Sequence, residues 1–368
     1  MTGDRSPVTV IIAGGGTGGH LMPALAIAAA LRRVHPQWRV LLVGAERGIE
    51  AGLLPSRDFP YQLLPAEPLY RKQWWKNFRW PLLALRLRRE VDRLLDREQP
   101  AVVVGTGGYA AGPVVWRAAR RGIPTAMLEL NAFPGLAVRW LARSVREVWL
   151  GSPEARRHLR AGPRTEIVET GAPIAPPEPA LRAEALQRFG LDPARPVFLV
   201  TGGSQGALAL NQVVAQWIEG GGSAGVQVLW VTGRTSFSRF EPLSRPPNVQ
   251  VFDFLDPLGP GYAVADLALA RAGMMTISEL CAWGIPSILV PLPSAAADHQ
   301  TPNARAMAAA GAGVFVAQAE LTATRLGEQV RALLGQRERL AVMRQAALAR
   351  ARPDALEGII ARIGVLSG

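Results

Sequence analysis

The sequence predicts an α/β protein of two doubly wound domains, each built on a parallel sheet. Strand-like and helix-like segments alternate throughout, and 368 residues suffice for about two domains with a core each. Glycine-rich turns at 14–20 and 202–206 each join a predicted strand to a predicted helix. Such turns present backbone N–H groups and the positive end of a helix dipole, which suit phosphate. We therefore expect the domains to meet across a cleft with phosphates on both walls.

The hydrophobic pattern places the elements in order. In the first half, strands are expected at 8–13, 39–43, 101–105, 124–129, 145–150 and 166–169, and helices at 20–34, 81–98, 112–121, 136–142 and 153–159. In the second half, strands are expected at 197–201, 226–232, 249–254, 266–270, 287–290 and 313–316, and helices at 207–218, 262–265, 276–283, 303–310 and 322–334.

Prolines mark the division between the domains. The stretch 171–179 carries four prolines, which disfavour helix and lack ladder donors. We expect a first domain at 7–172, a linker at 173–180 and a second domain at 181–352. The apolar helix of segment 353–368 is expected to cross back and complete the first domain.

Composition limits the class of protein. With 49% hydrophobic and 19% charged residues, the chain is globular. Cys281 is the only cysteine, so an intramolecular disulfide is impossible and a reducing cytosol fits. Its apolar neighbours predict a core residue. The start of the chain lacks the pattern of a signal peptide, and no apolar run is long enough to span a bilayer.

Half of the net charge of +12 lies in one segment. Segment 68–97 holds nine basic and three acidic residues, and its first half interleaves cations with aromatic residues. Basic charge alone is compatible with nucleic acid, and a core helix with a solvated basic face is a second interpretation. The tryptophans favour a third, a membrane-surface patch. Its residues are Trp74, Trp75, Lys76, Phe78 and Trp80.

The first glycine turn satisfies the dinucleotide pattern G-x-G-x-x-G at 14–19. A nicotinamide cofactor also needs an acid at the tip of the second strand, but Glu46 lies beyond that tip. We therefore reject an oxidoreductase. His20, directly after the glycines, is as compatible with a functional role as with a structural one.

The run 271–279 follows a predicted strand, so it lies at the carboxyl edge of a sheet, where such folds bind ligands. Glu279 is suited to bridge two ribose hydroxyls; alternatively, Thr276 and Glu279 form a capping box. Further on, the polar residues 298–303 could select sugar hydroxyls, but alone they are better explained as a loop capping a helix that begins near Asn303.

Together these residues resemble a known family, the bacterial transferases that complete lipid II. These are the UDP-N-acetylglucosamine–N-acetylmuramyl-(pentapeptide) pyrophosphoryl-undecaprenol N-acetylglucosamine transferases. The resemblance covers essentially the whole chain and rests on G-G-G-T-G-G-H at 14–20, G-T-G-G-Y at 105–109, Glu129 with Asn131, G-G-S-Q-G at 202–206, Phe254-Leu255, the run 271–279, and D-H-Q at 298–300 with Asn303. It implies the GT-B fold and an inverting transferase without metal or cofactor.

The resemblance also implies the site residues. The expected donor contacts are Thr17, Gly18, Gly19, Asn131, Ser204, Gln205, Leu255, Met274, Met275, Thr276, Glu279 and Gln300. Among these, Ser204 holds the diphosphate, the backbone of Leu255 the uracil and Glu279 the ribose. The loops 17–20 and 105–109 are expected to face the acceptor pyrophosphate, with Asn131 near the reacting centre. The expected acceptor contacts are Gly16, His20, Gly107, Gly108 and Tyr109.

The implied reaction is a direct displacement at the sugar's anomeric carbon by the muramyl 4-hydroxyl, which requires a base. His20 and Glu129 are the candidates, and His20 is favoured slightly because the unperturbed pKa of histidine lies near working pH. The implied partners are UDP-GlcNAc, lipid I, an anionic membrane surface and other cell-wall synthesis proteins, but not nucleic acid. The implied location is peripheral, on the cytoplasmic face of the plasma membrane.

Two departures from the family pattern keep alternatives open. Leucines 128 and 130 replace the polar neighbours of Glu129, and Ala175 stands where the family has an arginine that contacts the donor. Either Arg271 or Arg234 substitutes for it, or donor affinity is lower. Transfer to another glycolipid and non-catalytic binding of a UDP-sugar or lipid remain alternative functions.

Overall fold

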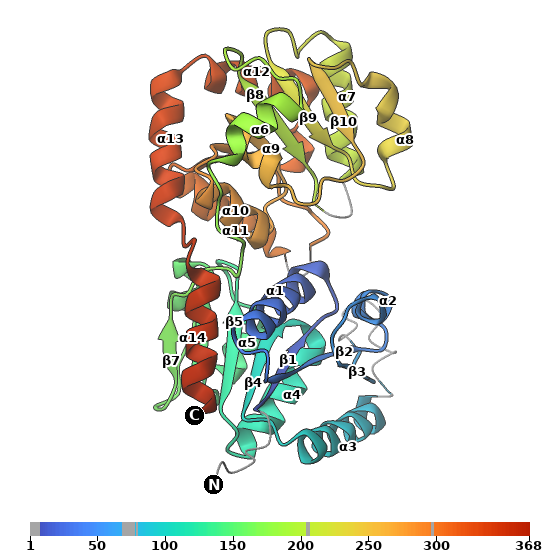
Figure 1. The fold of residues 1–368 in the computed structure, drawn as a ribbon, viewed down its shortest axis with the longest axis vertical. Coiled ribbons are helices and arrows are strands. Elements are labelled where there is room, and N and C mark those ends of the chain that lie inside the picture. The colour runs from blue at the N-terminus through green and yellow to red at the C-terminus, as the bar shows by residue number, and fades with distance from the viewer. Residues whose placement is uncertain (1–7, 68–77, 79, 204–206, 296–297) are drawn as a thin grey trace. The chain divides into compact units, whose positions relative to one another are not determined.

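Two parallel β-sheets organise the computed structural model, which describes residues 8–67, 78, 80–203, 207–295 and 298–368. The chain divides into two compact units (Figure 1). Unit 1 takes the chain up to Ile174 together with Asp354–Gly368, and unit 2 is Ala175–Pro353. Two parallel-sheet α/β units are the fold class that the sequence predicts.

The sheet of unit 1 has seven strands in the order β3-β2-β1-β4-β5-β6-β7, and every neighbouring pair is parallel. Its strands are β1 Thr9–Gly14, β2 Arg39–Ala45, β3 Tyr61–Leu64, β4 Val102–Gly107, β5 Thr125–Glu129, β6 Glu147–Leu150 and β7 Glu166–Val168. Its helices are α1 Gly18–Val34, α2 Glu50–Leu53, α3 Trp80–Glu98, α4 Gly108–Arg120, α5 Leu136–Leu141 and α14 Ala355–Ser367, with 3₁₀ turns η1 Leu54–Ser56 and η3 Pro153–His158.

Unit 2 repeats the scheme with six parallel strands in the order β10-β9-β8-β11-β12-β13. Its strands are β8 Val197–Thr201, β9 Gln227–Val231, β10 Val249–Phe252, β11 Leu267–Ala270, β12 Ser287–Leu289 and β13 Gly313–Phe315. Its helices are α6 Leu181–Arg188, α7 Leu208–Glu219, α8 Phe237–Phe240, α9 Gly259–Val264, α10 Met274–Ala282, α11 Gln300–Ala309, α12 Ala323–Leu334 and α13 Arg337–Arg350, with 3₁₀ turns η4 Glu241–Leu243 and η6 Gln318–Glu320.

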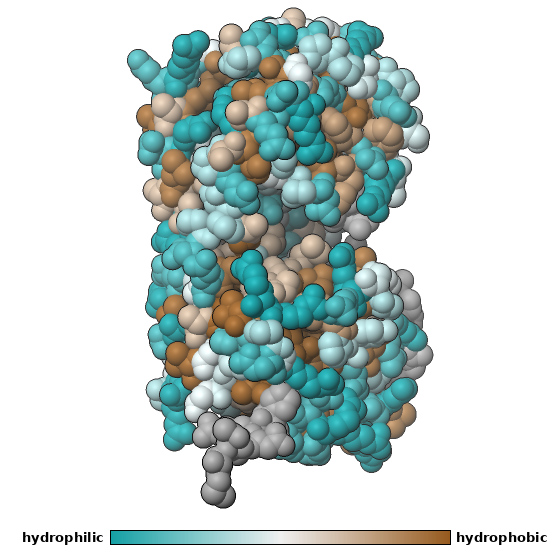
Figure 2. All heavy atoms as spheres, viewed as in Figure 1, coloured by the Kyte–Doolittle hydropathy of each residue, from teal (hydrophilic) through white to brown (hydrophobic). Residues whose placement is uncertain are grey.

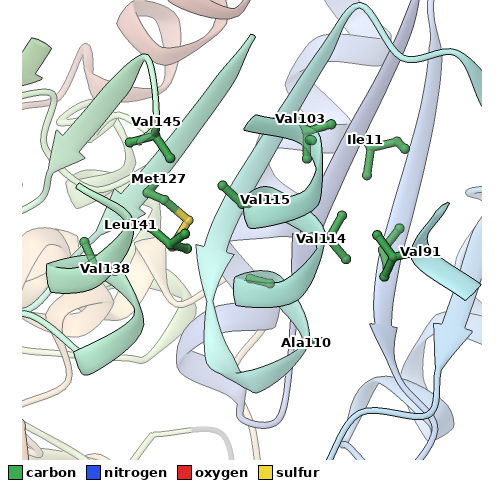
Figure 3. Close-up of a cluster of buried hydrophobic side chains, with 14 of the residues drawn as sticks. Ile11, Val91, Val103, Ala110, Val114, Val115, Met127, Val138, Leu141 and Val145 are labelled. Carbon is green, nitrogen blue, oxygen red and sulfur yellow. The ribbon is translucent and has the colours of Figure 1, made fainter. Parts of the chain in front are cut away.

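Apolar side chains from the strands and the covering helices form the cores. In unit 1, Ile11 of β1 and Val103 of β4 face Val114 of α4, and Leu141 of α5 lies against the same cluster (Figure 3). The strands are buried on both faces, as is typical of parallel sheets. The exterior still mixes hydrophilic and hydrophobic residues (Figure 2), as folded surfaces do.

Helix α3 shows how the sequence sets a buried face. Leu87, Val91, Leu94 and Leu95 recur at helical spacing and are buried. The basic residues Arg86, Arg88, Arg89 and Arg93 lie between them in sequence and are exposed. The alternative of a core helix with a solvated basic face therefore describes this part of the basic segment correctly.

Several elements differ from the prediction. Edge strand β3 and helices α2, α6 and α13 were not expected, because each is short or buries few apolar residues; α13 buries only Met343 and Ala347. The helix expected at 153–159 is the 3₁₀ turn η3, with proline at its start. Helices α4, α10 and α11 begin two to four residues earlier than predicted.

Helix α14 belongs to unit 1, although it follows unit 2 in the chain (Figure 1). Arg362 of α14 donates from Nε to Oε2 of buried Glu147 on β6 at 2.6 Å, and its Nη2 lies 2.9 Å from Oε1 of Glu166 on β7. The indole Nε1 of Trp149 donates to the same Glu147 oxygen at 2.6 Å. A charged network thus attaches α14 to the sheet.

Cys281 is buried on α10, as the sequence predicts. Its Sγ lies 3.7 Å from Sδ of Met307, and burial raises the pKa of the thiol to about 12.

Candidate functional site

Each of the two glycine-rich segments follows a strand at which the order of its sheet reverses. In unit 1, β1 and β4 are neighbours, although the chain first proceeds outward from β1 through β2 to β3. The turns at 14–20 and 105–109 follow these two strands and flank the reversal. In unit 2, β8 and β11 bear the same relation. Gly202 and Gly203 follow β8, while 204–206 lie outside the described residues, and the run 271–279 follows β11. Open parallel sheets bind ligands at this point.

The two turns of unit 1 pack directly on each other. Gly16 has φ +85° and stands against the ring of Tyr109, while Gly107 has φ +107° and stands against the ring of His20. A Cβ at either glycine would overlap the facing ring. Only glycine satisfies both the backbone conformation and the close approach. Four residues predicted for the acceptor site therefore form two contacting pairs, Gly16 with Tyr109 and Gly107 with His20.

His20 is held by groups on two elements. Its Nδ1 lies 3.2 Å from Oγ1 of Thr17, and its carbonyl oxygen accepts the hydroxyl of Thr106 at 2.8 Å. Thr106 is the last residue but one of β4 and is 1% exposed, so this hydroxyl anchors the first turn of α1 to the sheet. The imidazole is half-buried. The histidine thus has a fixed position with part of its ring accessible.

Glu129 ends β5 and organises the loop that follows it. Its Oε1 accepts the backbone N–H of Asn131 at 2.9 Å and the side-chain amide of Asn131 at 3.1 Å. Its Oε2 accepts the N–H of Gly135 at 2.7 Å. Burial raises the pKa of Glu129 above its usual value, and these hydrogen bonds act against that rise. Both oxygens are engaged, so Glu129 positions Asn131 rather than presenting a free carboxylate.

The donor residues predicted for unit 2 follow the carboxyl ends of three strands of its sheet, of which β11 and β12 are neighbours and β10 lies beyond β8 and β9. Leu255 lies in the loop after β10, Met274 to Glu279 lie on α10 after β11, and Gln300 begins α11 after β12. Ser204 and Gln205 fall outside the described residues. Oε1 of Gln300 accepts the N–H of Leu292 at 2.9 Å, which joins α11 to the loop after β12.

Glu279 is half-buried and has one partner. Tyr262 on α9 donates its hydroxyl to Oε2 of Glu279 at 2.7 Å. Burial raises the pKa of Glu279, and the hydrogen bond from Tyr262 lowers it. Burial, followed by the charge of Glu279, raises the pKa of Tyr262 well above its usual value, so the phenol remains a donor. Within the described part of the chain, Oε1 of Glu279 has no hydrogen-bond partner.

The capping-box alternative for Thr276 and Glu279 is wrong. Helix α10 begins at Met274 with Gly273 at its N-cap, so Thr276 is already inside the helix and Glu279 lies near its middle. The helix-start explanation for Asn303 is wrong as well. Helix α11 begins at Gln300, and buried Asn303 donates from Nδ2 to the carbonyl of Ala272 at 3.1 Å.

Arg271 is buried, and its guanidinium is hydrogen-bonded within unit 2. Its Nη1 donates to the carbonyls of Val290 and Pro291 at 3.2 and 3.1 Å, and its Nη2 donates to Oε1 of Gln318 at 2.7 Å. Burial lowers its pKa to about 10. Of the two arginines considered as substitutes for the missing one, only Arg234 is exposed, with its guanidinium 5.0 Å from the ring centroid of Phe254.

The predicted membrane patch is described only at its end, since Trp74, Trp75 and Lys76 lie outside the described residues. Phe78 is 74% exposed, and Trp80 begins α3 half-buried. The structure adds exposed apolar residues that the sequence analysis missed: Leu82 on α3, and Leu136 and Trp140 on α5. The sequence signal for this surface was Trp140, which lies beside an arginine near the end of the short helix α5.

Three further residues were missed. Tyr262 and Thr106 are recognisable only from their contacts with Glu279 and His20. Buried Glu50, on α2, accepts the N–H of Gly16 in the first glycine turn. An acid flanked by glycines after the second strand was the sequence signal for Glu50.

Over the ranges that the structure describes, no three His, Cys, Asp or Glu side chains are grouped so that they could hold a metal ion. In the same ranges, no helix is long and apolar enough to cross a bilayer.

Two parallel-sheet α/β units of seven and six strands, together with the family matches that follow, are those of a glycosyltransferase of the GT-B fold. The model of the glycosyltransferase family 28 N-terminal domain matches residues 10–150, and the model of its C-terminal domain matches residues 197–359. The chain belongs to this family, within the group of UDP-N-acetylglucosamine–N-acetylmuramyl-(pentapeptide) pyrophosphoryl-undecaprenol N-acetylglucosamine transferases.

Full-length relatives carry that name. The chain is 41% identical to the transferase of Moorella thermoacetica, with 95% of this chain and 97% of the relative aligned. It is 40% identical to that of Desulforudis audaxviator, with 98% of each aligned. The crystal structure of Acinetobacter baumannii MurG superposes with a TM-score of 0.76 at 28% identity, covering 98% of this chain and 100% of that one.

Proposed function

We propose that this chain transfers N-acetylglucosamine from UDP-GlcNAc to the muramyl 4-hydroxyl of undecaprenyl-pyrophosphoryl-MurNAc-pentapeptide, lipid I, with inversion, giving lipid II for peptidoglycan synthesis. The observation that carries the proposal is the presence of the ligand-binding turns of both units in a chain related over its full length to enzymes of that name. The names of these relatives contain both the donor sugar and the lipid-linked acceptor.

Unit 2 supplies the donor site in this proposal. The carboxylate of Glu279 has one oxygen held by Tyr262 and the other available for a ribose hydroxyl. The residues that surround the nucleotide and the sugar follow the carboxyl ends of three strands of one parallel sheet, β10, β11 and β12; they are Leu255, Met274, Met275, Thr276 and Gln300. Ser204 and Gln205 hold the diphosphate, and exposed Arg234 provides the positive charge that Ala175 lacks.

Unit 1 supplies the acceptor site. Gly16, Gly107, Gly108 and Tyr109 form its floor, and Thr17, Gly18 and Gly19 present the start of α1. The muramyl oxygen forms the new bond to the anomeric carbon as the bond from that carbon to UDP breaks. His20 takes the hydroxyl proton, because its imidazole is fixed and partly accessible, whereas both oxygens of Glu129 already accept hydrogen bonds.

The enzyme binds peripherally to the cytoplasmic face of the plasma membrane in this proposal, since its acceptor carries a polyprenyl tail. The exposed apolar side chains are Phe78 (74% exposed), Leu82 (78%), Leu136 (61%) and Trp140 (64%). Exposed arginines follow on α3, and Trp140 stacks on Trp116 of α4. Apolar groups can enter the headgroup layer while each nearby arginine contributes about 1 kcal/mol of attraction to anionic lipid.

The decisive experiment is transfer of labelled sugar from UDP-GlcNAc to lipid I in detergent by the purified protein. Formation of lipid II supports the proposal. Release of UDP without labelled lipid II overturns it in favour of another acceptor, and UDP binding without any turnover favours a non-catalytic protein. In an active enzyme, Glu279→Ala should raise the donor KM far more than the acceptor KM. Glu338→Ala, on the exposed first turn of α13, is the control.

Vesicle binding tests the membrane surface separately. Phe78→Ser with Leu82→Ser should weaken sedimentation with phosphatidylglycerol vesicles and leave transfer to a short-chain acceptor unchanged. Val342→Ser, at a site 68% exposed on unit 2, is the matched control. Equal vesicle binding by all three proteins would refute this surface.

A further inference from the structure

Glu50 is a buried carboxylate in an unusual position. Its relative exposure is 0%, and it begins α2 just after β2, the strand beside β1. Among the described residues, no Arg, Lys or His forms an ion pair with it. Burying a charge without a cation is unfavourable unless hydrogen bonds replace its hydration. The hydrogen-bond donors around Glu50 therefore indicate the role of this carboxylate in the fold.

Two backbone amides replace that hydration. The N–H of Gly16 donates to Oε1 at 3.0 Å and to Oε2 at 2.8 Å. The N–H of Ala45, the last residue of β2, donates to Oε1 at 2.7 Å. The carboxylate thus links the first glycine turn to the end of the neighbouring strand. An apolar side chain could fill the space but could accept neither bond.

Glycines enclose the carboxylate on several sides. A Cβ placed on Gly15, Gly44 or Gly48 would overlap the side chain of Glu50. The absence of a side chain at these three positions therefore provides the space that the side chain of Glu50 occupies. Gly16 itself lies between this carboxylate and the ring of Tyr109, so its peptide is held from two directions.

The held amide also changes how the turn can bind phosphate. In a dinucleotide-binding turn, amides such as that of Gly16 face the phosphate. Here the N–H of Gly16 already donates to Glu50, whose Oε2 lies 2.8 Å from the amide nitrogen and occupies the place that a phosphate oxygen would take. Within the described residues, Gly18 and Gly19 at the start of α1 have no hydrogen-bond acceptor. A phosphate at this turn is therefore directed toward α1 and the side of His20.

We propose that Glu50 is a positioning residue of the acceptor site, which fixes the first glycine turn and, through it, the amides of α1 and the imidazole of His20. The inference rests on the proposed function, because it assigns the turn to the acceptor pyrophosphate. Glu50 itself touches neither substrate.

The test is Glu50→Gln, which keeps the shape of the side chain. With its oxygen at the Oε1 position, the glutamine can still accept the N–H of Ala45 and the longer of the two bonds from Gly16. Its amide nitrogen then stands at the Oε2 position, where the shorter bond from Gly16 becomes a donor against a donor. We expect the acceptor KM to rise about tenfold or more and kcat to fall, with the donor KM within about twofold of wild type.

Glu147→Gln is the matched control. Glu147 is a second buried glutamate of unit 1, and it accepts bonds from Trp149 and Arg362 on β6 and α14, away from the glycine turns. This variant should lower Tm without changing either KM. If both variants change Tm and kinetics alike, Glu50 is merely structural and the inference is overturned.

A measurement on the unmodified protein covers the case in which Glu50→Gln does not fold. Amide exchange followed by NMR should find the Gly16 N–H protected to the same degree as amides of the core strands. Exchange at the rate of an exposed loop would overturn the inference. Failure of the wild type to make lipid II would instead overturn the proposed function, while the exchange result would still decide whether Glu50 holds Gly16.

Discussion

Replacing Tyr262 with Phe removes one atom from unit 2, the phenolic oxygen that donates to Oε2 of Glu279 at 2.7 Å. The ring stays in place, because Tyr262 is buried beside Trp283 with ring centroids 6.4 Å apart. A hydrogen bond to a charged group contributes about 1.5–3 kcal/mol. Because Glu279 is only half-buried, we take the lower value, which corresponds to roughly a tenfold rise in donor KM.

The pH dependence gives a second readout of Tyr262→Phe. Burial raises the pKa of Glu279, and the bond from Tyr262 opposes that rise. Without the bond, the pKa rises further. Glu279 must be ionised to accept ribose hydroxyls well, so donor affinity is lost as pH falls through its pKa. In the variant that loss should begin at a higher pH than in wild type. Initial rates at varied UDP-GlcNAc and saturating acceptor, from pH 5.5 to 8.5, measure both effects.

Tyr61→Phe is the control for this experiment, since Tyr61 lies on edge strand β3 of unit 1 and is 41% exposed. It should leave the donor KM and its pH profile unchanged. A Tyr262→Phe enzyme with a donor KM within twofold of wild type and an identical profile would refute the assignment of Glu279 to the ribose.

Three further perturbations address unit 1. Arg362→Gln leaves buried Glu147 without its guanidinium, so we expect a loss of about 2 kcal/mol, or roughly 4–8 °C in calorimetric Tm; an unchanged transition would contradict the role of this pair. Thr106→Val removes the hydroxyl that holds the carbonyl of His20, and kcat should fall several-fold with the donor KM unchanged in steady-state assays; a wild-type kcat would argue against positioning through Thr106. Burial raises the pKa of Glu129, so the folded state holds that proton more tightly than the unfolded state. Wild type should therefore lose stability relative to Glu129→Gln as pH rises from the usual glutamate pKa through the raised one, measured by urea unfolding; the opposite slope would show that the hydrogen bonds outweigh burial.

The architecture could be predicted because the signals that define it are local. Continuous apolar runs such as Val102–Gly107 predict buried parallel strands, and glycines directly after a strand predict a turn into a helix. Strand β3 carries a weak signal because it is a four-residue strand at the edge of the sheet. Helix α13 carries a weak signal because its stability comes from packing against α10, which is distant in the sequence. Their presence depends on the tertiary structure.

The contacts that hold the site together could not be predicted in the same way. Sequence reasoning sought an acid at the tip of the second strand and found Glu46, which is exposed, whereas Glu50, four residues later, lies against the glycine turn. Tyr262 on α9 and Glu279 on α10 are separated in the chain by strand β11, and the fold brings their side chains within hydrogen-bond distance. Such side-chain contacts depend on the tertiary structure, and no local sequence pattern predicts them. The ligand roles of the predicted residues stay predictions.

The attachment of α14 to unit 1 has a consequence for how the protein is made. Unit 2 is one continuous segment, whereas unit 1 is interrupted by it. During synthesis, the ribosome therefore delivers the closing helix of unit 1 only after the whole of unit 2 has emerged. Until Arg362 arrives, Glu147 has no guanidinium to balance its buried charge. Unit 2 can therefore complete its core first. Unit 1, whose synthesis begins earlier, can complete its fold only after unit 2 has been synthesised.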